Sequence, residues 1–385
     1  MNKRTLLHFC FILIIYLVII KPAYIVNINV PILKISVSYL FYFIQLILIL
    51  LLGAIKIKNK KIKKMDVIIV FLVVSAILSN IENGYNILLA LDNYINLFVT
   101  YLFFDYELKN NKYEFIRISA IIFVFLLIIN YLSILLKPIN YFNQNTRIHF
   151  LGYDNDVVPI IFTFLLFLTL NIYLKNGKNT FSYIGIGIAI LTLLKTWSAN
   201  GIVGLVILLI YLVFFRKNKT DKIINFKNIF ILSIIVFVCL VVFRMQDKLE
   251  YIIVNVLNRD ITFTGRTRIW DNALKTWKEH KLFGVGIFDF IQRSKIYGVY
   301  HAHCTYLNIL FEVGIFGFLI RMFLFKEVNN ILKRYHTIIS SLIVCFFAIY
   351  FSITTIEVYV NDILFYALLG LSINLEKFNN EELIN

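Results

Sequence analysis

Arg266, Arg268, His301 and His303 lie in or beside one long polar stretch, residues 245–301, of an otherwise apolar chain. The stretch contains Thr264-Gly265-Arg266-Thr267-Arg268-Ile269-Trp270 and runs into His301-Ala302-His303. A guanidinium group binds phosphate oxygens through paired hydrogen bonds, and an imidazole titrates near neutral pH and can accept a proton from a hydroxyl. We therefore expect this part of the chain to bind an anionic substrate.

A short amphipathic helix is expected in this polar stretch. Thr267 is a suitable N-cap for a helix that starts near Arg268, and Gly284 is a suitable end. Three large apolar residues would share one face, which would lie on the membrane surface or pack on the ends of other helices: Trp270, Leu274 and Trp277. Packing alone is the alternative explanation for the tryptophans.

Arg266 and Arg268 would stand at the positive end of this helix. Backbone N–H groups are unpaired there, and an anion is stabilised. A general role at the protein surface is the alternative for both arginines. Gly284-Val285-Gly286 resembles part of a nucleotide-binding loop, but no strand precedes it, so we read these glycines as a tight turn.

His301 and His303 lie at the expected start of a helix, and Glu312 lies nine residues beyond His303, roughly 13 Å along a helix at 1.5 Å per residue. Side chains two residues apart diverge on a helix, which disfavours a metal site formed by the two histidines. His303 is our candidate for the base that takes a proton from a sugar hydroxyl.

The composition is that of an integral membrane protein. Of 385 residues, 60% are hydrophobic, and they occur in runs near twenty residues long, as helices that cross a bilayer require. A barrel would show shorter, alternating segments. The net charge of +16 comes mostly from Lys and Arg clusters between apolar runs, such as residues 56–64, which indicates membrane orientation and not nucleic-acid binding. The four cysteines show neither a disulfide framework nor zinc spacing.

The fold class is therefore all-α, a polytopic membrane protein with about twelve transmembrane helices and one large extracytoplasmic loop. We expect transmembrane helices in residues 1–244, the loop with its short helix in 245–301, and three further helices and a cytoplasmic tail in 302–385. The first apolar run is expected to stay uncleaved. The expected spans are 6–26, 35–55, 65–80, 84–104, 115–136, 157–174, 180–197, 200–215, 228–244, 302–321, 336–355 and 359–376.

The positive clusters place both termini in the cytoplasm. Three stretches then emerge on the extracytoplasmic side: the one around Arg147, the one at 197–201, and the one from Arg266 to His303. One pocket could use all three. For Arg147 the alternative is an interfacial arginine whose side chain reaches to the membrane surface.

The motifs together resemble the O-antigen ligase and polysaccharide polymerase superfamily of membrane glycosyltransferases. An earlier element, Arg147 to Gly152 with Asn155, also looks like the family pattern. Two positions depart from the family pattern. Many members have an arginine after the serine, where this chain has Ser198-Ala199-Asn200, so the anion site lacks one positive group unless Lys195 supplies it. Cys304 follows the histidine where the family has asparagine. The motifs that carry the resemblance are 264–270, 284–286, Ala302-His303, Tyr306-Leu307, Glu312-Val313-Gly314 and Gly317.

The resemblance implies transfer of an oligosaccharide from undecaprenyl pyrophosphate to another glycan, with inversion, on the outer face of the bacterial cytoplasmic membrane. It assigns Arg266 and Arg147 to the pyrophosphate, with Arg268 as a weaker candidate. Glu312 joins the substrate-binding set, and His303 acts as base. It implies no cofactor, nucleotide or metal. The expected partners are the lipid-linked donor, the glycan acceptor, the bilayer and other polysaccharide-assembly membrane proteins.

Three functions remain open at this point. We favour a polymerase of capsular, exopolysaccharide or O-antigen repeat units. A ligase that moves lipid-linked glycan to a different acceptor shares the donor and the leaving group. A transporter or flippase also fits twelve spans, but such proteins usually show related halves, and here the long polar loop lies late in the chain.

Overall fold

The computed structural model describes residues 3–27, 30–136, 147–215, 225–245, 265–359 and 362–379. In these ranges the chain forms helices and one isolated bridge between Ile148 and Tyr153. The helices are α1 (Lys3–Ile20), α2 (Ala23–Val26), α3 (Pro31–Lys58), α4 (Lys64–Glu82), α5 (Ile87–Asn110), α6 (Lys112–Leu136), α8 (Val157–Leu174), α9 (Thr180–Thr196), α10 (Ala199–Ile210), η1 (Tyr211–Phe215), α11 (Phe226–Phe237), η2 (Val238–Val242), α12 (Arg266–Glu279), α13 (Phe290–Tyr297), α14 (Thr305–Leu332), α15 (Ile338–Thr355), α16 (Ile363–Ile373) and α17 (Glu376–Asn379).

Among the described residues, eight helices are long and apolar enough to cross a membrane, and four apolar helices are shorter. Large apolar side chains on the bundle's outside are exposed, as on α3, where Ile32 is 76% and Leu50 is 70% exposed. An exposed apolar surface of this kind is favourable in contact with lipid, whereas contact with water would cost free energy. The all-α polytopic fold is confirmed, while the count of twelve crossings stays a prediction because four helices are short for a bilayer.

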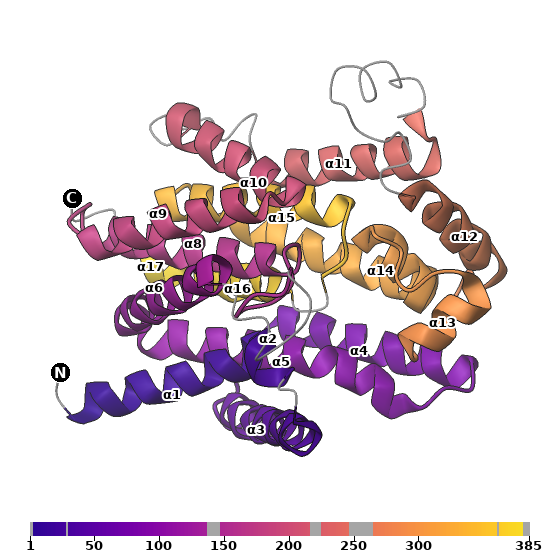
Figure 1. Ribbon diagram of the computed structural model, residues 1–385, viewed down its shortest axis with the longest axis horizontal. Helices are drawn as coiled ribbons and strands as arrows, with labels where there is room; N and C mark the ends of the chain where they lie inside the picture. The colour runs from indigo at the N-terminus through magenta and orange to yellow at the C-terminus, as the bar shows by residue number, and fades with distance from the viewer. Residues whose placement is uncertain are drawn as a thin grey trace.

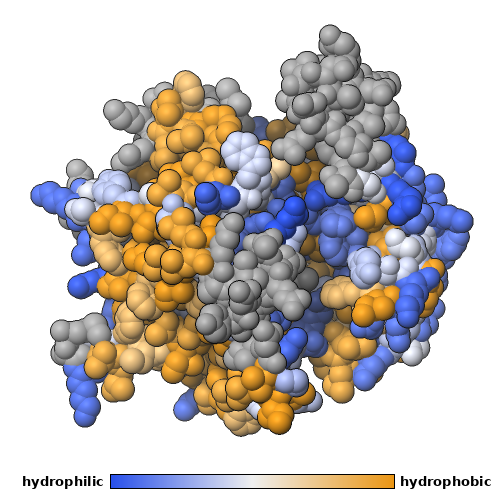
Figure 2. Space-filling view, viewed as in Figure 1, coloured by the Kyte–Doolittle hydropathy of each residue, from blue (hydrophilic) through white to orange (hydrophobic). Residues whose placement is uncertain are grey.

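The polar helices and the described chain ends lie at opposite ends of the bundle. In Figure 1 the start of α1 and the short α17 lie at the left, and α12 and α13 lie at the right. Figure 2 shows apolar surface over the bundle and polar surface over α12 and α13. The described helices of the polar stretch, α12 and α13, thus lie away from the described chain ends, and the side of the membrane on which each lies stays a prediction.

The amphipathic helix begins two residues earlier than expected. α12 starts at Arg266, and the residue before it, Gly265, takes a left-handed conformation with φ of 84°. Thr267 is therefore inside the first turn and not the N-cap, and the helix ends at Glu279, before Gly284. The predicted apolar face is confirmed: Trp270 is fully buried, and Leu274 and Trp277 pack on the core, with α12 lying against α14.

A second short helix, α13, was not expected. The Asp289 carboxylate accepts hydrogen bonds from the backbone N–H groups of Ile291 and Gln292, at 2.9 and 3.0 Å. Gly298 ends the helix with φ of 68°, a conformation that glycine adopts readily. An Asp and a Gly that flank eight residues are recognisable helix signals, and they could have identified α13 from the sequence.

The helix α14 is interrupted at Gly314, whose φ of 65° and ψ of −166° are not helical. The chain that follows α12 packs into this break. Backbone N–H groups of Val285 and Gly286 donate to the carbonyls of Phe311 and Glu312, at 2.8 and 3.0 Å. A Cβ atom at Gly314 would lie 2.3 Å from the Leu282 carbonyl oxygen. The glycines of both motifs are therefore required for close backbone contact.

Polar side chains of α4 hold this contact in place. The Ser79 hydroxyl donates to the carbonyl oxygens of Phe283 and Glu312. The Asn80 amide donates to the Ile287 carbonyl at 2.8 Å and accepts from the Ile287 N–H at 2.6 Å. The carbonyl groups freed by the break are thus satisfied inside the protein, as non-helical backbone at membrane depth requires. Glu312 is positioned by this junction.

Candidate active site

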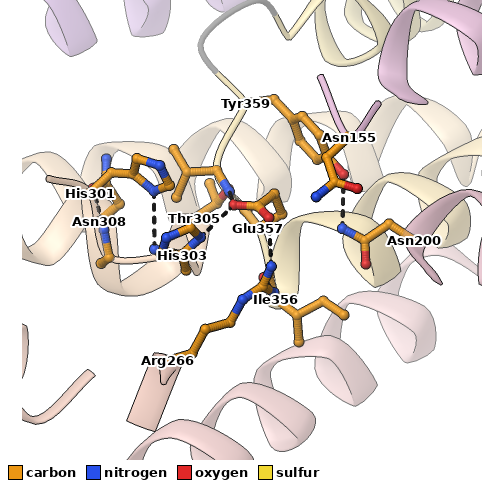
Figure 3. A network of polar contacts seen from close by, with 12 residues as sticks. Asn155, Asn200, Arg266, His301, His303, Thr305, Asn308, Ile356, Glu357 and Tyr359 are labelled. Atoms are coloured by element: carbon orange, nitrogen blue, oxygen red, sulfur yellow. Dashed lines mark hydrogen bonds and ion pairs between the residues drawn. The ribbon is translucent and has the colours of Figure 1, made fainter. Parts of the chain in front are cut away.

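The centre of the candidate site is Glu357, in the connection between α15 and α16. One carboxylate oxygen lies 2.7 Å from Nδ1 of His303, and the other accepts a hydrogen bond of 2.8 Å from Nη2 of Arg266. Arg266 also donates through Nη1 to the Ile356 carbonyl. Figure 3 shows Glu357 between the two basic side chains. The structure thus brings Arg266 and His303, the two expected catalytic residues, onto one carboxylate.

Glu357 carries a negative charge in this environment. Burial alone would raise the pKa of its carboxyl group, but the hydrogen bond with His303 and the charge of Arg266 outweigh burial and hold the pKa below its usual value. Its side chain is 7% exposed, while those of Arg266 and His303 are 21% and 28% exposed. The carboxylate is therefore buried, and both basic groups reach solvent.

His303 lies before α14 and not on it. The helix begins at Thr305, and His303 has φ of 44°, a left-handed conformation that is uncommon for a residue with a side chain. The rings of His301 and His303 lie 4.1 Å apart at their centroids. The argument that the two side chains diverge on a helix was therefore wrong, because the chain turns here before the helix starts.

The turn makes a cation site geometrically possible. Ligand atoms of His301, His303 and Glu357 lie within 4.8 Å of one another. However, both Glu357 oxygens already bind His303 and Arg266, and the adjacent guanidinium repels a cation. Burial, together with the nearby His303, Arg266 and Arg293, lowers the pKa of His301 to about 4, although Glu357 opposes the shift. His301 is therefore neutral at neutral pH.

Residues from two other segments lie beside Glu357. The Asn200 amide, at the start of α10, donates to the Tyr359 hydroxyl at 3.0 Å. The Ser198 hydroxyl donates to the side-chain oxygen of Asn155 at 2.9 Å. Asn155, Asn200 and Tyr359 are drawn on one side of Glu357 in Figure 3. The segments at 147–155 and 197–201 therefore reach the same site as α12 and His303, as the predicted single pocket requires.

The remaining basic residues expected at the site are exposed on the protein surface. Arg147 is exposed and donates from Nη1 to the Tyr153 hydroxyl at 3.2 Å. Arg268 is exposed on the first turn of α12, and Lys195 is exposed near the end of α9. Neither is paired with a carboxylate among the described residues. Contact of Arg147 or Arg268 with a pyrophosphate stays a prediction.

Glu312 is held by an arginine that the sequence analysis missed. Nη1 of Arg293, on α13, lies 2.6 Å from the Glu312 carboxylate, and the Arg293 side chain is fully buried. Arg293 Nη2 donates to the Phe288 carbonyl at 3.2 Å, and its guanidinium lies 5.3 Å from the Phe288 ring centroid. The pair joins α13 to α14 next to His301.

Glu357 was also missed. The expected spans 336–355 and 359–376 leave it in a connection of three residues, where a single carboxylate has no periodic pattern to identify it. The usable signal was its side of the membrane, since that connection is expected to emerge where Arg266 and His303 do. Arg293 carried no such signal because α13 was read as loop.

Comparison with protein families gives one match that bears on this site. Residues 184–322 match the family model described as O-Antigen ligase, a range that includes Asn200, Arg266, Arg293, His303 and Glu312. Among curated proteins no significant match is found. The match supports the O-antigen ligase and polysaccharide polymerase superfamily, as the motifs predict, and it does not separate polymerases from ligases.

Proposed function

We propose that this chain polymerises oligosaccharide repeat units linked to undecaprenyl pyrophosphate, on the outer face of the bacterial cytoplasmic membrane, because residues 184–322 match the family model described as O-Antigen ligase. An enzyme of this superfamily acts on lipid-linked glycans. The observation that carries the proposal is the Arg266–Glu357–His303 arrangement. It offers a cation for the leaving group and a base for the acceptor, without paired catalytic carboxylates.

In the proposed reaction an acceptor hydroxyl attacks the anomeric carbon of the donor sugar. The bond from that carbon to the pyrophosphate oxygen breaks, and the electron pair leaves with the pyrophosphate. Negative charge grows on the leaving group, so a positioned guanidinium such as Arg266 stabilises the transition state more than the ground state. Attack from the face opposite the leaving group inverts the anomeric configuration.

His303 takes the proton of the attacking hydroxyl in this proposal. Its Nδ1 is hydrogen-bonded to Glu357, which fixes the tautomer that carries the proton on Nδ1 and leaves Nε2 free to accept. Glu357 then stabilises the imidazolium that forms. Because Glu357 also binds Arg266, one carboxylate sets the distance between the base and the anion-binding group.

Two products distinguish polymerase from ligase. Purified protein in liposomes receives only the lipid-linked repeat unit extracted from producing cells, and the glycans are separated by length. A ladder of lengths supports a polymerase. A product that forms only after a second, different acceptor is added supports a ligase, which the family description also allows.

The role of His303 is tested in the same assay. His303→Ala is expected to lower the rate about a hundredfold or more, since general base catalysis contributes roughly 10²–10⁴. His280→Ala is the matched control, because His280 lies at the end of α12, away from Glu357. A normal product ladder from His303→Ala would contradict the proposed base.

A further inference from the structure

A cavity of about 120 Å³ lies beside Glu357 and extends into the bundle. His301, Thr305 and Tyr359 line its part next to the candidate site, and Arg321 and Asp362 line it further in. Thr305 and Arg321 are sixteen residues apart on α14, about four helical turns. The cavity therefore leads from the candidate catalytic groups toward the interior.

Two buried charged side chains in this cavity have incomplete hydrogen bonding. Asp362 is 7% exposed, and its Oδ1 has no partner among the described residues. Arg321 is 8% exposed; its Nη2 donates to the Tyr350 hydroxyl at 3.0 Å, but its Nε has no partner in the same part of the chain. A buried polar atom without a partner is costly, so these side chains gain free energy if they turn to meet a polar occupant of the cavity.

The lining points to the chemistry of that occupant. Hydrogen-bonding side chains of both kinds, donors such as Arg321 and Asn308 and acceptors such as Glu312 and Asp362, face the same space as the Tyr94 and Tyr366 rings. A sugar ring presents hydroxyls that donate and accept, on an apolar frame that packs on aromatic side chains. A cavity of about 150 Å³ holds benzene, a ring of six heavy atoms, in another protein. The space of about 120 Å³ here is smaller, so it has room for one edge of a hexose with its hydroxyl groups and not for the whole sugar.

We propose that this cavity receives one edge of a hexose-like sugar ring of the substrate glycan, with a ring hydroxyl donating to the Asp362 carboxylate. The inference rests on the proposed function, because it takes the glycan as the substrate of the neighbouring His303 and Arg266. It assigns glycan selection to Asp362, Arg321 and their neighbours, separately from pyrophosphate binding by Arg266. A structural cavity filled only with water is the competing explanation.

Binding of two lipids separates sugar contacts from pyrophosphate contacts. The full-length protein in nanodiscs carries His303→Ala, so that substrate is bound but not consumed. It is titrated with the lipid-linked repeat unit extracted from producing cells and, separately, with undecaprenyl pyrophosphate that carries no sugar. Asp362→Asn is compared with Asp289→Asn, which makes the same exchange at the exposed N-cap of α13, where asparagine caps equally well.

Asp362→Asn is expected to weaken binding of the sugar-carrying lipid about tenfold, because the accepting group loses its charge and the hydrogen bond becomes weaker. Its affinity for undecaprenyl pyrophosphate and that of Asp289→Asn for either lipid should be unchanged. Equal affinities with and without Asp362→Asn, or equal losses for both lipids, would overturn the inference while leaving the proposed function intact. If the parent protein binds neither lipid, the proposed function fails and this inference fails with it.

Discussion

Two clusters of buried charge lie at opposite ends of α16, and one of them contains a histidine that can gain a proton. The Glu357 cluster consists of Arg266, His303 and Glu357, before the start of α16. The Asp105 cluster lies near its end, where the Asn374 amide donates to Asp105 at 3.0 Å. Its members are Lys56, Lys63, Asp66 and Asp105. Both clusters consist of ion pairs and hydrogen bonds between side chains, so the types of contact alone do not show which cluster belongs to a functional site.

The Asp105 cluster is balanced. Two lysines face two aspartates, Lys56 lies 2.7 Å from Asp105, and the Tyr101 hydroxyl donates to Asp66 at 2.7 Å. These residues come from α3, α4, α5 and the chain between α3 and α4, so the contacts join several helices. The Lys56 side chain is 11% and that of Asp105 is 5% exposed. Such a network links the helices, and each of its aspartates is paired with a lysine.

The charge of the Glu357 cluster is balanced only while His303 is neutral, as a base must be. One carboxylate serves a guanidinium and an imidazole that both reach solvent. Any proton taken by His303 leaves net positive charge beside the cavity, where a leaving pyrophosphate would be stabilised. The comparison teaches that a net charge that changes during the reaction, and not the presence of buried ion pairs, distinguishes the candidate site from a structural contact. Perturbing each cluster should therefore have opposite consequences for folding and for turnover.

Lys56→Met should have the largest effect of the substitutions considered, and this effect should be on folding. Removing one partner leaves buried carboxylates without their closest cation, which costs about 3–5 kcal/mol when a buried pair is broken. The expected result is a much lower thermal midpoint in detergent, with normal turnover per folded molecule. Lys58→Met, on the same helix but exposed, is the control. A lower turnover per folded molecule with an unchanged thermal midpoint for Lys56→Met would contradict the structural role of the Asp105 cluster.

Arg266→Ala should do the reverse. Loss of one positioned donor to a developing anion costs about 10²–10³ in rate, while Glu357 keeps its hydrogen bond with His303. The thermal midpoint should change little, because Arg266 is partly exposed. Lys275→Ala, an exposed position on the same helix, should retain normal turnover. Turnover within threefold of the parent protein would remove Arg266 from the proposed mechanism.

Much of the fold could be predicted from the sequence because lipid imposes a simple rule on it. Each expected span overlaps an apolar helix, from α1 to α16, since about twenty apolar residues satisfy both hydrophobicity and backbone hydrogen bonding. The polar stretch was harder. Gly265 and not Thr267 precedes α12, and α14 is interrupted at Gly314, where the backbone of Leu282 packs closely against it.

The site was also predictable only in part. Arg266 and His303 were identifiable from residue type and motif, but the residue that joins them, Glu357, is 54 residues from His303 in the chain. Arg293 pairs with Glu312 across the α13–α14 contact, which no local pattern encodes. Local sequence therefore indicated the chemistry, and the tertiary contacts determine which carboxylate orients the base.

The smallest effect concerns His301, which lies beside the Glu357 cluster and makes the stability of the folded protein depend on pH. Burial and the neighbouring His303, Arg266 and Arg293 lower its pKa to about 4 in the folded protein, from the usual 6.5. The unfolded chain then binds a proton that the folded protein does not, so stability is complete above pH 6.5 and is lost as pH falls toward 4. We expect a loss of about 2–3 kcal/mol over this range, seen as a falling thermal midpoint. His301→Asn should flatten that profile, whereas Lys56→Met should shift it down without changing its slope. A slope that His301→Asn leaves intact would mean that another group near the Glu357 cluster titrates in this range.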